Sequence, residues 1–193
     1  ECEACGVRSV PLAADVSDPD QAMALVERAG AAFPHIDVLV PVAALRPHKN
    51  VWEIPVAEWQ RVFAINVHAT FYLAKALAPG MMARRRGSIV AIGGTASVTS
   101  RPYCGHVVSS KHALYGLVKS LALELGPYNV RANLIAVGPI ATERRNPEWY
   151  PEAGGQPLAV ANARRVTPLG RAGTPDEIAN VAVLDRKSTR LNS

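Results

Sequence analysis

The stretch GSIVAIGGTASVTSRPYCGHVVSSKHALYGLVKSLALELG, residues 87–126, decides the fold of this chain. Residues 88–92 form a short β-branched run that is typical of a buried parallel strand. Small and turn-forming residues follow, and apolar residues at three- and four-residue spacing then indicate a helix that carries Lys111 in its first turns. A strand, a loop and a helix in this order predict a ligand site at the carboxyl end of the strand.

The composition is that of an ordinary folded domain. Of the 193 residues, 49% are hydrophobic and 19% are charged, which fits a single domain with one core. No apolar run reaches the length of a membrane span and no charged-then-apolar leader opens the sequence, so we expect no membrane partner and a cytoplasmic location. The three cysteines argue against a disulfide framework, and the histidines lack metal-ligand spacing, so no metal site is expected.

The last nine residues, DRKSTRLNS at 185–193, look like a translated sequencing adapter. We interpret them as a non-native tail after a domain at 1–184. Leaving them out lowers the net charge from +5 to +3. The remaining basic cluster, Arg84, Arg85 and Arg86, fits the carboxyl end of a helix, where cations are favoured. We therefore expect no nucleic-acid partner, although a basic nucleic-acid-binding domain is a third hypothesis.

Strands and helices alternate along the rest of the chain, which predicts a parallel sheet with helices on both faces. The expected strands are 7–16, 36–42, 88–92 and 130–137. The expected helices are 17–33, 59–65, 66–82, the helix near 107–125, a short helix at 158–165 and a last helix from about 175. A mobile loop is expected at 143–157, which is rich in Pro and Gly.

Several motifs occur in an order and spacing that resemble the short-chain dehydrogenase/reductase family. They are Asp15-Val16, the strand 36–40, Asn66, Lys111, the segment NLIAVGPIAT at 133–142, and PLGR at 168–171 followed by TPDEIA at 174–179. The resemblance covers residues 7–184. It implies a doubly wound, parallel-sheet, Rossmann-like α/β fold.

The resemblance also implies an activity, namely hydride transfer between NAD or NADP and a small alcohol or carbonyl substrate. Carried over by position, Lys111 would bind the cofactor and tune the proton donor, and Asn66 would support a water relay. The positions that would contact the cofactor are Asp15, Val16, Ala43, Lys111, Ile140 and Thr142. Family members are commonly dimers or tetramers, so a homo-oligomer is expected.

The sequence departs from the family at the groups that carry the chemistry. Val107 stands at the position of the family's Tyr and Gly94 at that of its Ser, and neither side chain can donate a proton. His106, next to Val107, is a possible acid/base with a suitable pKa range. Tyr103 and Thr95 are weaker substitutes. A non-catalytic dinucleotide-binding or scaffold protein is therefore the alternative hypothesis.

Family members have further strands that this sequence lacks. The Gly-rich turn with the family's first two strands and the closing strand is not found, so the resemblance predicts an incomplete sheet. The missing strands would lie between residues 7–16 and 36–42. We expect the first predicted strand either to slide in beside 36–42 or to pack poorly and leave an exposed edge.

Overall fold

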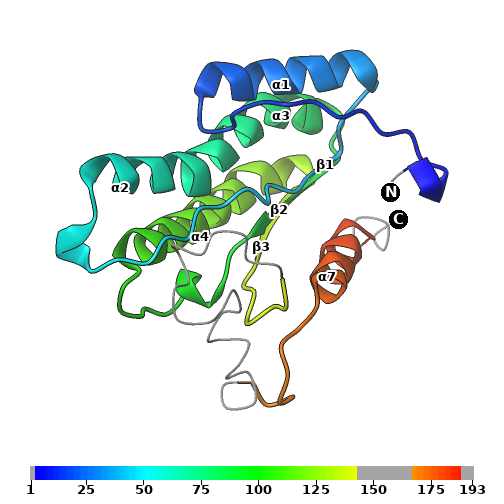
Figure 1. Ribbon diagram of the computed structural model, residues 1–193. Helices are drawn as coiled ribbons and strands as arrows, with labels where there is room; N and C mark the ends of the chain where they lie inside the picture. The colour runs from blue at the N-terminus through cyan, green and yellow to red at the C-terminus, as the bar shows by residue number, and fades with distance from the viewer. Residues whose placement is uncertain (1–2, 143–166, 188–193) are drawn as a thin grey trace.

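The computed structural model describes residues 3–142 and 167–187, and three parallel strands form its sheet (Figure 1). These are β1 (Val38–Leu39), β2 (Gly87–Ile92) and β3 (Val130–Ile135), with β2 in the centre. β2 and β3 pair along their whole length, from Gly87 opposite Val130 to Ile92 opposite Ile135. The predicted parallel α/β architecture is therefore confirmed.

Helices cover both faces of this sheet. They are α1 (Pro19–Ala32), α2 (Val56–Phe63), α3 (Ala69–Ala83), α4 (Gly105–Leu125) and α7 (Pro175–Lys187). The π-helical turn Ala64–His68 joins α2 to α3, and α1 packs outside α3 (Figure 1). No helix in the described ranges is both long and apolar enough to span a bilayer.

The pleat of the strands assigns each face its partner, because alternate residues point to opposite sides. Ile89, Ala91 and Ala132 face α3 and α4 and form the main apolar core with Leu114 and Val118 of α4. The other face carries Ser88, Arg131 and Asn133, and α7 approaches it with Asp185. The Asp185 carboxylate accepts hydrogen bonds from Ser88 Oγ at 2.7 Å and Asn133 Nδ2 at 2.7 Å and pairs with Arg131 Nη1 at 2.9 Å.

The end of α7 overlaps the predicted tail. Because α7 runs through Lys187, three residues of 185–193 belong to this helix. The non-native origin of the tail and the domain bounds stay predictions. The expected loop at 143–157 and the short helix at 158–165 lie outside the described residues.

The prediction of a first strand at residues 7–16 is wrong. Residues 7–15 have no regular secondary structure and pair with no strand of the described sheet, so the expected sliding against 36–42 does not occur. The second strand is reduced to Val38–Leu39, since Pro41 cannot donate a ladder hydrogen bond. Within the described residues β1 pairs only with β2, which leaves its other edge without a strand. The backbone groups of a strand need a neighbouring strand as hydrogen-bond partner. Residues 7–15 have no such partner in the described sheet, and they are exposed or half-buried.

The amino-terminal cap of the first helix and the position of the basic cluster agree with the predictions from the sequence. Asp18 caps α1 by accepting from the backbone N–H groups of Asp20 and Gln21. At the carboxyl end of α3, Arg84 and Arg86 pair with Asp37 at 3.5 and 3.2 Å. These contacts give two of the three clustered arginines a structural role.

Candidate functional site

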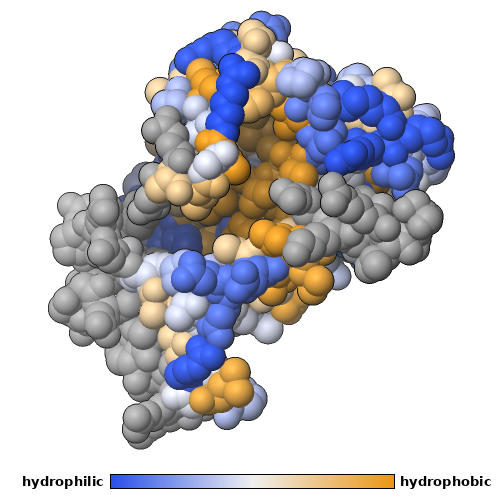
Figure 2. Space-filling view, turned by 90° about the vertical axis from the view of Figure 1, so that its right-hand side faces the viewer, coloured by the Kyte–Doolittle hydropathy of each residue, from blue (hydrophilic) through white to orange (hydrophobic). Residues whose placement is uncertain are grey.

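A large cavity opens at the carboxyl ends of the strands, where open α/β sheets place their ligands. Its volume of about 1220 Å³ exceeds the ~300–1,000 Å³ of most ligand pockets. Three segments supply its walls: residues 40–50 after β1, 92–111 from the end of β2 into α4, and 137–142 after β3. α7 closes a further side with Ile178. Figure 2 shows a hollow with a mainly apolar interior.

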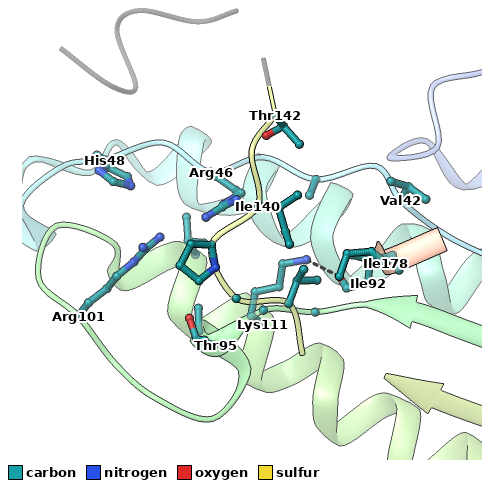
Figure 3. A pocket seen from close by; sticks show the side chains of 18 of the residues that line it. Val42, Arg46, His48, Ile92, Thr95, Arg101, Lys111, Ile140, Thr142 and Ile178 are labelled. Atoms are coloured by element: carbon teal, nitrogen blue, oxygen red, sulfur yellow. Dashed lines mark hydrogen bonds between the residues drawn. The ribbon is translucent and has the colours of Figure 1, made fainter. Parts of the chain in front are cut away.

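Lys111 is the buried cation of this cavity (Figure 3). It projects from the second turn of α4 with a relative exposure of 6%, and its Nζ donates a hydrogen bond to Ile92 O at 2.8 Å. Burial, and to a smaller extent the nearby positive charge of Arg46, lower the pKa of Lys111 to about 8. Its amine is therefore partly neutral slightly above neutral pH, unlike an exposed lysine.

Asn66 lies behind the cavity wall rather than on it. Its buried amide accepts from the backbone N–H of Leu45 at 2.8 Å and donates to Leu45 O at 3.0 Å and to Ser110 Oγ at 2.9 Å. Ser110 Oγ in turn donates to Val107 O at 2.9 Å. Asn66 therefore ties the loop after β1 to the second turn of α4, which also carries Lys111.

The two positions that lack a proton donor both lie on the cavity wall. Val107 is 1% exposed and is one helical turn before Lys111, so the two side chains share a face of α4. Gly94 has an extended backbone, and a Cβ placed on it would come no closer than 3.6 Å to another atom, Val137 O. The backbone at position 94 therefore accepts a Cβ without a close contact.

His106 points elsewhere. Its ring is fully buried, and Nε2 lies 3.3 Å from Glu58 Oε1 of α2, while Lys49 Nζ contacts the other oxygen of Glu58 at 2.7 Å. Burial lowers the pKa of His106, and the carboxylate of Glu58 acts against this shift. His106 is absent from the cavity lining because one residue along a helix is a turn of about 100°. The structure brings it to Glu58 and not to Lys111.

The weaker candidates line the rim. Thr95 borders the cavity, and so does Tyr103, which is 58% exposed and has a left-handed backbone with φ of 62°. His48, which the sequence analysis does not single out, borders it as well. The backbone N–H of Lys49 donates to Tyr103 O at 2.9 Å, which fastens the loop after β1 to the loop before α4. These residues surround the cavity opening.

The predicted cofactor-contacting residues fall into two groups. Ile140 and Thr142 line the cavity with Lys111, whereas Asp15, Val16 and Ala43 do not. Gly173 packs closely against the Ile140 side chain: a Cβ at position 173 would lie 2.8 Å from Ile140 Cδ1.

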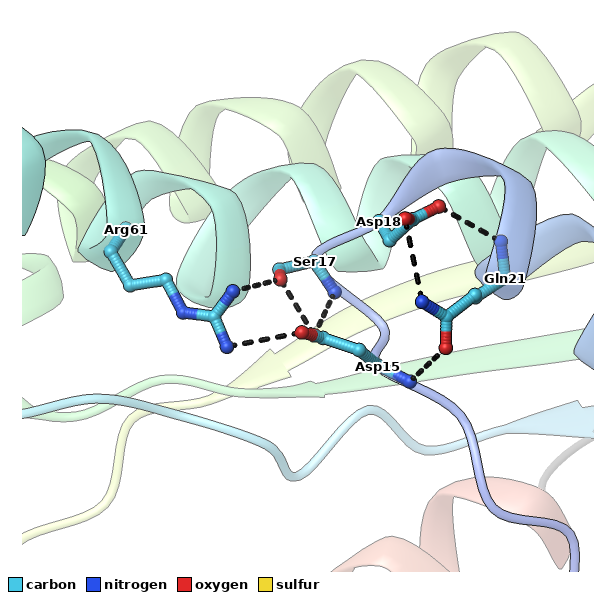
Figure 4. Close-up of polar contacts among 5 residues, drawn as sticks. All are labelled: Asp15, Ser17, Asp18, Gln21 and Arg61. Carbon is cyan, nitrogen blue, oxygen red and sulfur yellow. Dashed lines mark hydrogen bonds and ion pairs between the residues drawn. The ribbon is translucent and has the colours of Figure 1, made fainter.

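Asp15 is instead part of a polar corner beside α1 and α2 (Figure 4). Its carboxylate accepts from Ser17 Oγ at 2.6 Å and pairs with Arg61 at 3.1 Å. The hydrogen bonds from Ser17 are the main reason that the pKa of Asp15 is lowered.

Sequence reasoning missed Arg46. It lines the cavity near Lys111, yet it lies in a loop of irregular structure after Pro41-Val42-Ala43-Ala44, where no periodicity marks it. Only its place shortly after a strand could have drawn attention to it. No cluster of three or more His, Cys, Asp or Glu side chains in the described part of the chain could hold a metal ion.

Comparison with known proteins gives consistent matches. Residues 2–184 match the family described as Enoyl-(Acyl carrier protein) reductase. L-rhamnose 1-dehydrogenase (NAD(P)(+)) of Sphingomonas sp. is 32% identical over 184 residues, which are 95% of this chain and 70% of that protein. The inactive 2-(S)-hydroxypropyl-CoM dehydrogenase 2 of Xanthobacter autotrophicus is 31% identical over 180 residues, 92% of this chain and 77% of that protein.

A solved structure agrees with these relatives. A 3-oxoacyl-(acyl-carrier protein) reductase with bound NAD from Brucella melitensis superposes with a TM-score of 0.81 at 36% identity, over 96% of this chain and 69% of that one. Homologues of the chain are dehydrogenases and reductases that use NAD or NADP. Because the family match covers nearly its whole length and is supported by relatives and fold alike, the chain belongs to the short-chain dehydrogenase/reductase family.

Proposed function

We propose that this chain takes part in hydride transfer between NAD or NADP and a small alcohol or carbonyl compound. The observation that carries the proposal is Lys111, a buried ammonium that lines a large apolar cavity at the carboxyl ends of the parallel strands. A structural lysine of a surface helix would place its Nζ in solvent, because burying the charge is costly. The cavity is also large enough for a nicotinamide and a small substrate together.

The described residues fit the nicotinamide end of the cofactor. Lys111 Nζ has further donor positions beside its bond to Ile92 O, and these could hold ribose hydroxyls. Ile140 and Thr142 would border the ring, and Asn66 would keep Lys111 in place through Ser110 and the start of α4. When bound, the nicotinamide supplies or accepts the hydride.

The proton is the weaker half of the proposal. Val107 and Gly94 offer no donor, so the remaining candidates on the cavity wall are the Lys111 ammonium, with its pKa of about 8, the Thr95 hydroxyl, the Tyr103 phenol and the His48 ring. His106 stays a predicted acid/base, but its ring faces Glu58. Losing a positioned general acid typically costs about 10²–10⁴ in rate, so slow turnover is expected.

A second candidate function follows from the same two positions. A protein that keeps Lys111 and the cavity but lacks the donors at Val107 and Gly94 could bind a dinucleotide without turning over a substrate. One relative at similar identity carries the word inactive in its name, which supports keeping this candidate. The two candidates differ in hydride transfer and agree in cofactor binding.

The test separates binding from turnover. NADH and NADPH binding is followed by nicotinamide fluorescence for the native chain, Lys111→Ala and Lys119→Ala. Lys119 is the matched control because it lies on the exposed side of α4, near the Tyr115 ring. We expect Lys111→Ala to weaken binding about tenfold, the loss of roughly one charge-assisted hydrogen bond, and Lys119→Ala to have no effect.

The outcomes then divide the candidates. Binding with slow oxidation of NADH by a ketone supports the enzyme, and binding without any turnover supports the non-catalytic protein. A folded chain that binds neither dinucleotide contradicts both.

The oligomeric state and the cellular location are proposed as well. We propose a dimer or tetramer formed through α3 and α4, whose outer surfaces expose Phe71, Tyr115 and Leu123. The proposed location is the cytoplasm, where NAD and NADP are supplied. Light scattering of the purified chain measures the first, and fractionation of the source cells measures the second.

A further inference from the structure

One carboxylate beside the cavity faces two basic side chains. Glu58 pairs through Oε2 with Lys49 Nζ at 2.7 Å, and its Oε1 lies 3.3 Å from Nε2 of His106. These residues belong to α2, to the loop after β1 and to the first turn of α4, respectively. Because Lys49 lines the cavity, Glu58 connects a part of the cavity wall to the helix that carries Lys111.

The two contacts of this carboxylate differ in quality. The Lys49 side chain is 40% exposed and forms a short hydrogen bond, whereas His106 is fully buried and neither of its ring nitrogens has a hydrogen-bond partner among the described residues. Within the same part of the chain, Glu58 Oε1 also has none. Buried polar groups without a partner are costly. A proton on the ring would place an N–H at Nε2 and supply this missing hydrogen bond.

Two charges act on the His106 ring from neighbouring elements. Burial lowers the pKa of His106, the Glu58 carboxylate opposes this shift, and the Lys49 ammonium adds to it. On α4 and at its start, Lys111 lines the cavity and Cys104 is a buried thiol. Further titratable side chains on the elements packed against α4 have partners of their own, namely Arg61 with Asp15, Arg131 with Asp185, and His68 with the Tyr72 ring.

The effect of Lys49 on His106 works in both directions. The ammonium in its present position makes protonation of the ring harder, so a proton on the ring weakens the binding of that ammonium by the same free energy. The charge of Glu58 would then be shared between two cations that repel each other. Lys49 is the partner that can leave, because its half-exposed side chain reaches water without the cost of burying a charge.

The Lys49 side chain is one of the ties that hold residues 46–50 in the cavity wall. Before this stretch, Leu45 is fastened to Asn66 by two hydrogen bonds. At its end, the backbone N–H of Lys49 donates to Tyr103 O at 2.9 Å. Release of the Lys49 side chain from Glu58 would remove the tie to α2, and the backbone bond to Tyr103 would break more often as a result.

We propose that Lys49, Glu58 and His106 form a proton-sensitive latch on the wall of the cavity. With a neutral His106 ring, Glu58 holds Lys49, and residues 46–50 stay in place. With a protonated ring, Glu58 pairs with His106, the Lys49 side chain is released, and this wall opens more readily. The inference goes beyond the proposed function, because the latch controls access to the cavity whether or not a hydride is transferred.

The first test measures the pKa of His106 by NMR titration of its ring, with His106→Gln assigning the signal. Lys49→Met is expected to raise this pKa, because it removes a repelling cation, and Glu58→Gln is expected to lower it, because it removes the attracting carboxylate. A merely structural disturbance of one ion pair would not give shifts of opposite sign. Lys119→Met and Glu124→Gln make the same charge changes at exposed sites on α4, and they should leave the pKa of His106 unchanged.

The second test measures the opening itself by amide hydrogen exchange. The probes in the native chain are the N–H of Lys49, which donates to Tyr103 O, and the N–H of Ser88, which donates to Asp37 O beside the sheet. Protection relative to an unstructured peptide at the same pH is expected to be lower at Lys49 than at Ser88. We expect it to fall at least about threefold at Lys49 between pH 7 and 5.5, because the open state takes up a proton. In His106→Gln it should keep its value at pH 7.

Three results would each overturn the latch. The first is a shift of the same sign, or no shift, of the His106 pKa in Lys49→Met and Glu58→Gln. The second is protection of Lys49 equal to that of Ser88 at both pH values, since the wall would then open only with the whole molecule. The third is a fall in Lys49 protection that persists in His106→Gln. The exchange comparison of Lys49 with Ser88 uses the native chain, so it decides even if a variant fails to fold.

Discussion

Two parts of the cavity differ in their polar side chains. We use floor for the buried polar residues Asn66, Ser110 and Lys111, and lip for the pair Gly94 and Val107. The floor is buried, and its polar atoms are joined to backbone groups on both sides of the cavity. The lip has the wall positions and the space for a proton donor but no polar side chain.

This difference shows how architecture and chemistry can separate. Asn66 of the floor also holds the fold, because its amide satisfies both the N–H and the C=O group of Leu45. A lip residue touches mainly the cavity, so its replacement by an apolar group leaves no buried group without a partner. Structure can therefore persist at the floor after the reaction chemistry has been lost or moved.

The largest effect is expected when proton donors are introduced at the two lip positions. The double variant Gly94→Ser/Val107→Tyr is expected to raise the rate of NADH oxidation by a ketone such as 2-hexanone, or by 2-oxohexanoate, about 10²–10⁴-fold. The reason is that a phenol one turn before Lys111 would have its pKa lowered by the ammonium. Steady-state absorbance at the nicotinamide band measures the gain.

Val108→Tyr is the matched control for this gain. It adds the same side chain to α4 one residue further on, away from the cavity wall. No gain from a double variant that stays folded and still binds NADH would mean that the floor no longer supports catalysis.

The interior of the fold could be predicted because its signals are local. The β-branched run at 88–92 and the helical spacing of Leu114 and Val118 each report burial directly, and β2 and α4 follow. The strand at 7–16 was wrong because its apolar residues say nothing about whether a neighbouring strand exists. A strand needs the backbone hydrogen-bonding groups of a neighbouring strand, and the local sequence does not contain that neighbour.

The candidate site divides along similar lines. Spacing from Lys111 located Val107 and Gly94, and all three line the cavity. His106 shows the limit of spacing, since adjacent helical residues point in different directions and its ring pairs with the half-buried Glu58. Arg46 could not be predicted, because a loop residue is brought to Lys111 by tertiary structure alone.

A smaller effect is expected at the floor itself. Asn66→Ala removes the partners of the Leu45 N–H and C=O groups, each of which costs about 1–3 kcal/mol when left unpaired in the interior. We expect the free energy of unfolding to fall by about 2–4 kcal/mol in urea titrations. Asn180→Ala, at an exposed site on α7, is the control and should change it by less than ~0.5 kcal/mol. Equal stability of both variants would show that the Asn66 network does not hold the floor.

The smallest effect concerns His106, behind the lip. Because burial lowers its pKa below the ordinary 6.5, the unfolded chain binds this proton more readily than the folded one, and stability falls as pH drops below about 6.5. We expect the free energy of unfolding to fall as the pH is lowered from 7 to 5.5, measured by urea titration at each pH. His106→Gln should flatten this slope, whereas His112→Gln, at an exposed site on the same helix, should keep it. An unchanged slope in His106→Gln would instead mean that the Glu58 carboxylate compensates the burial of the ring.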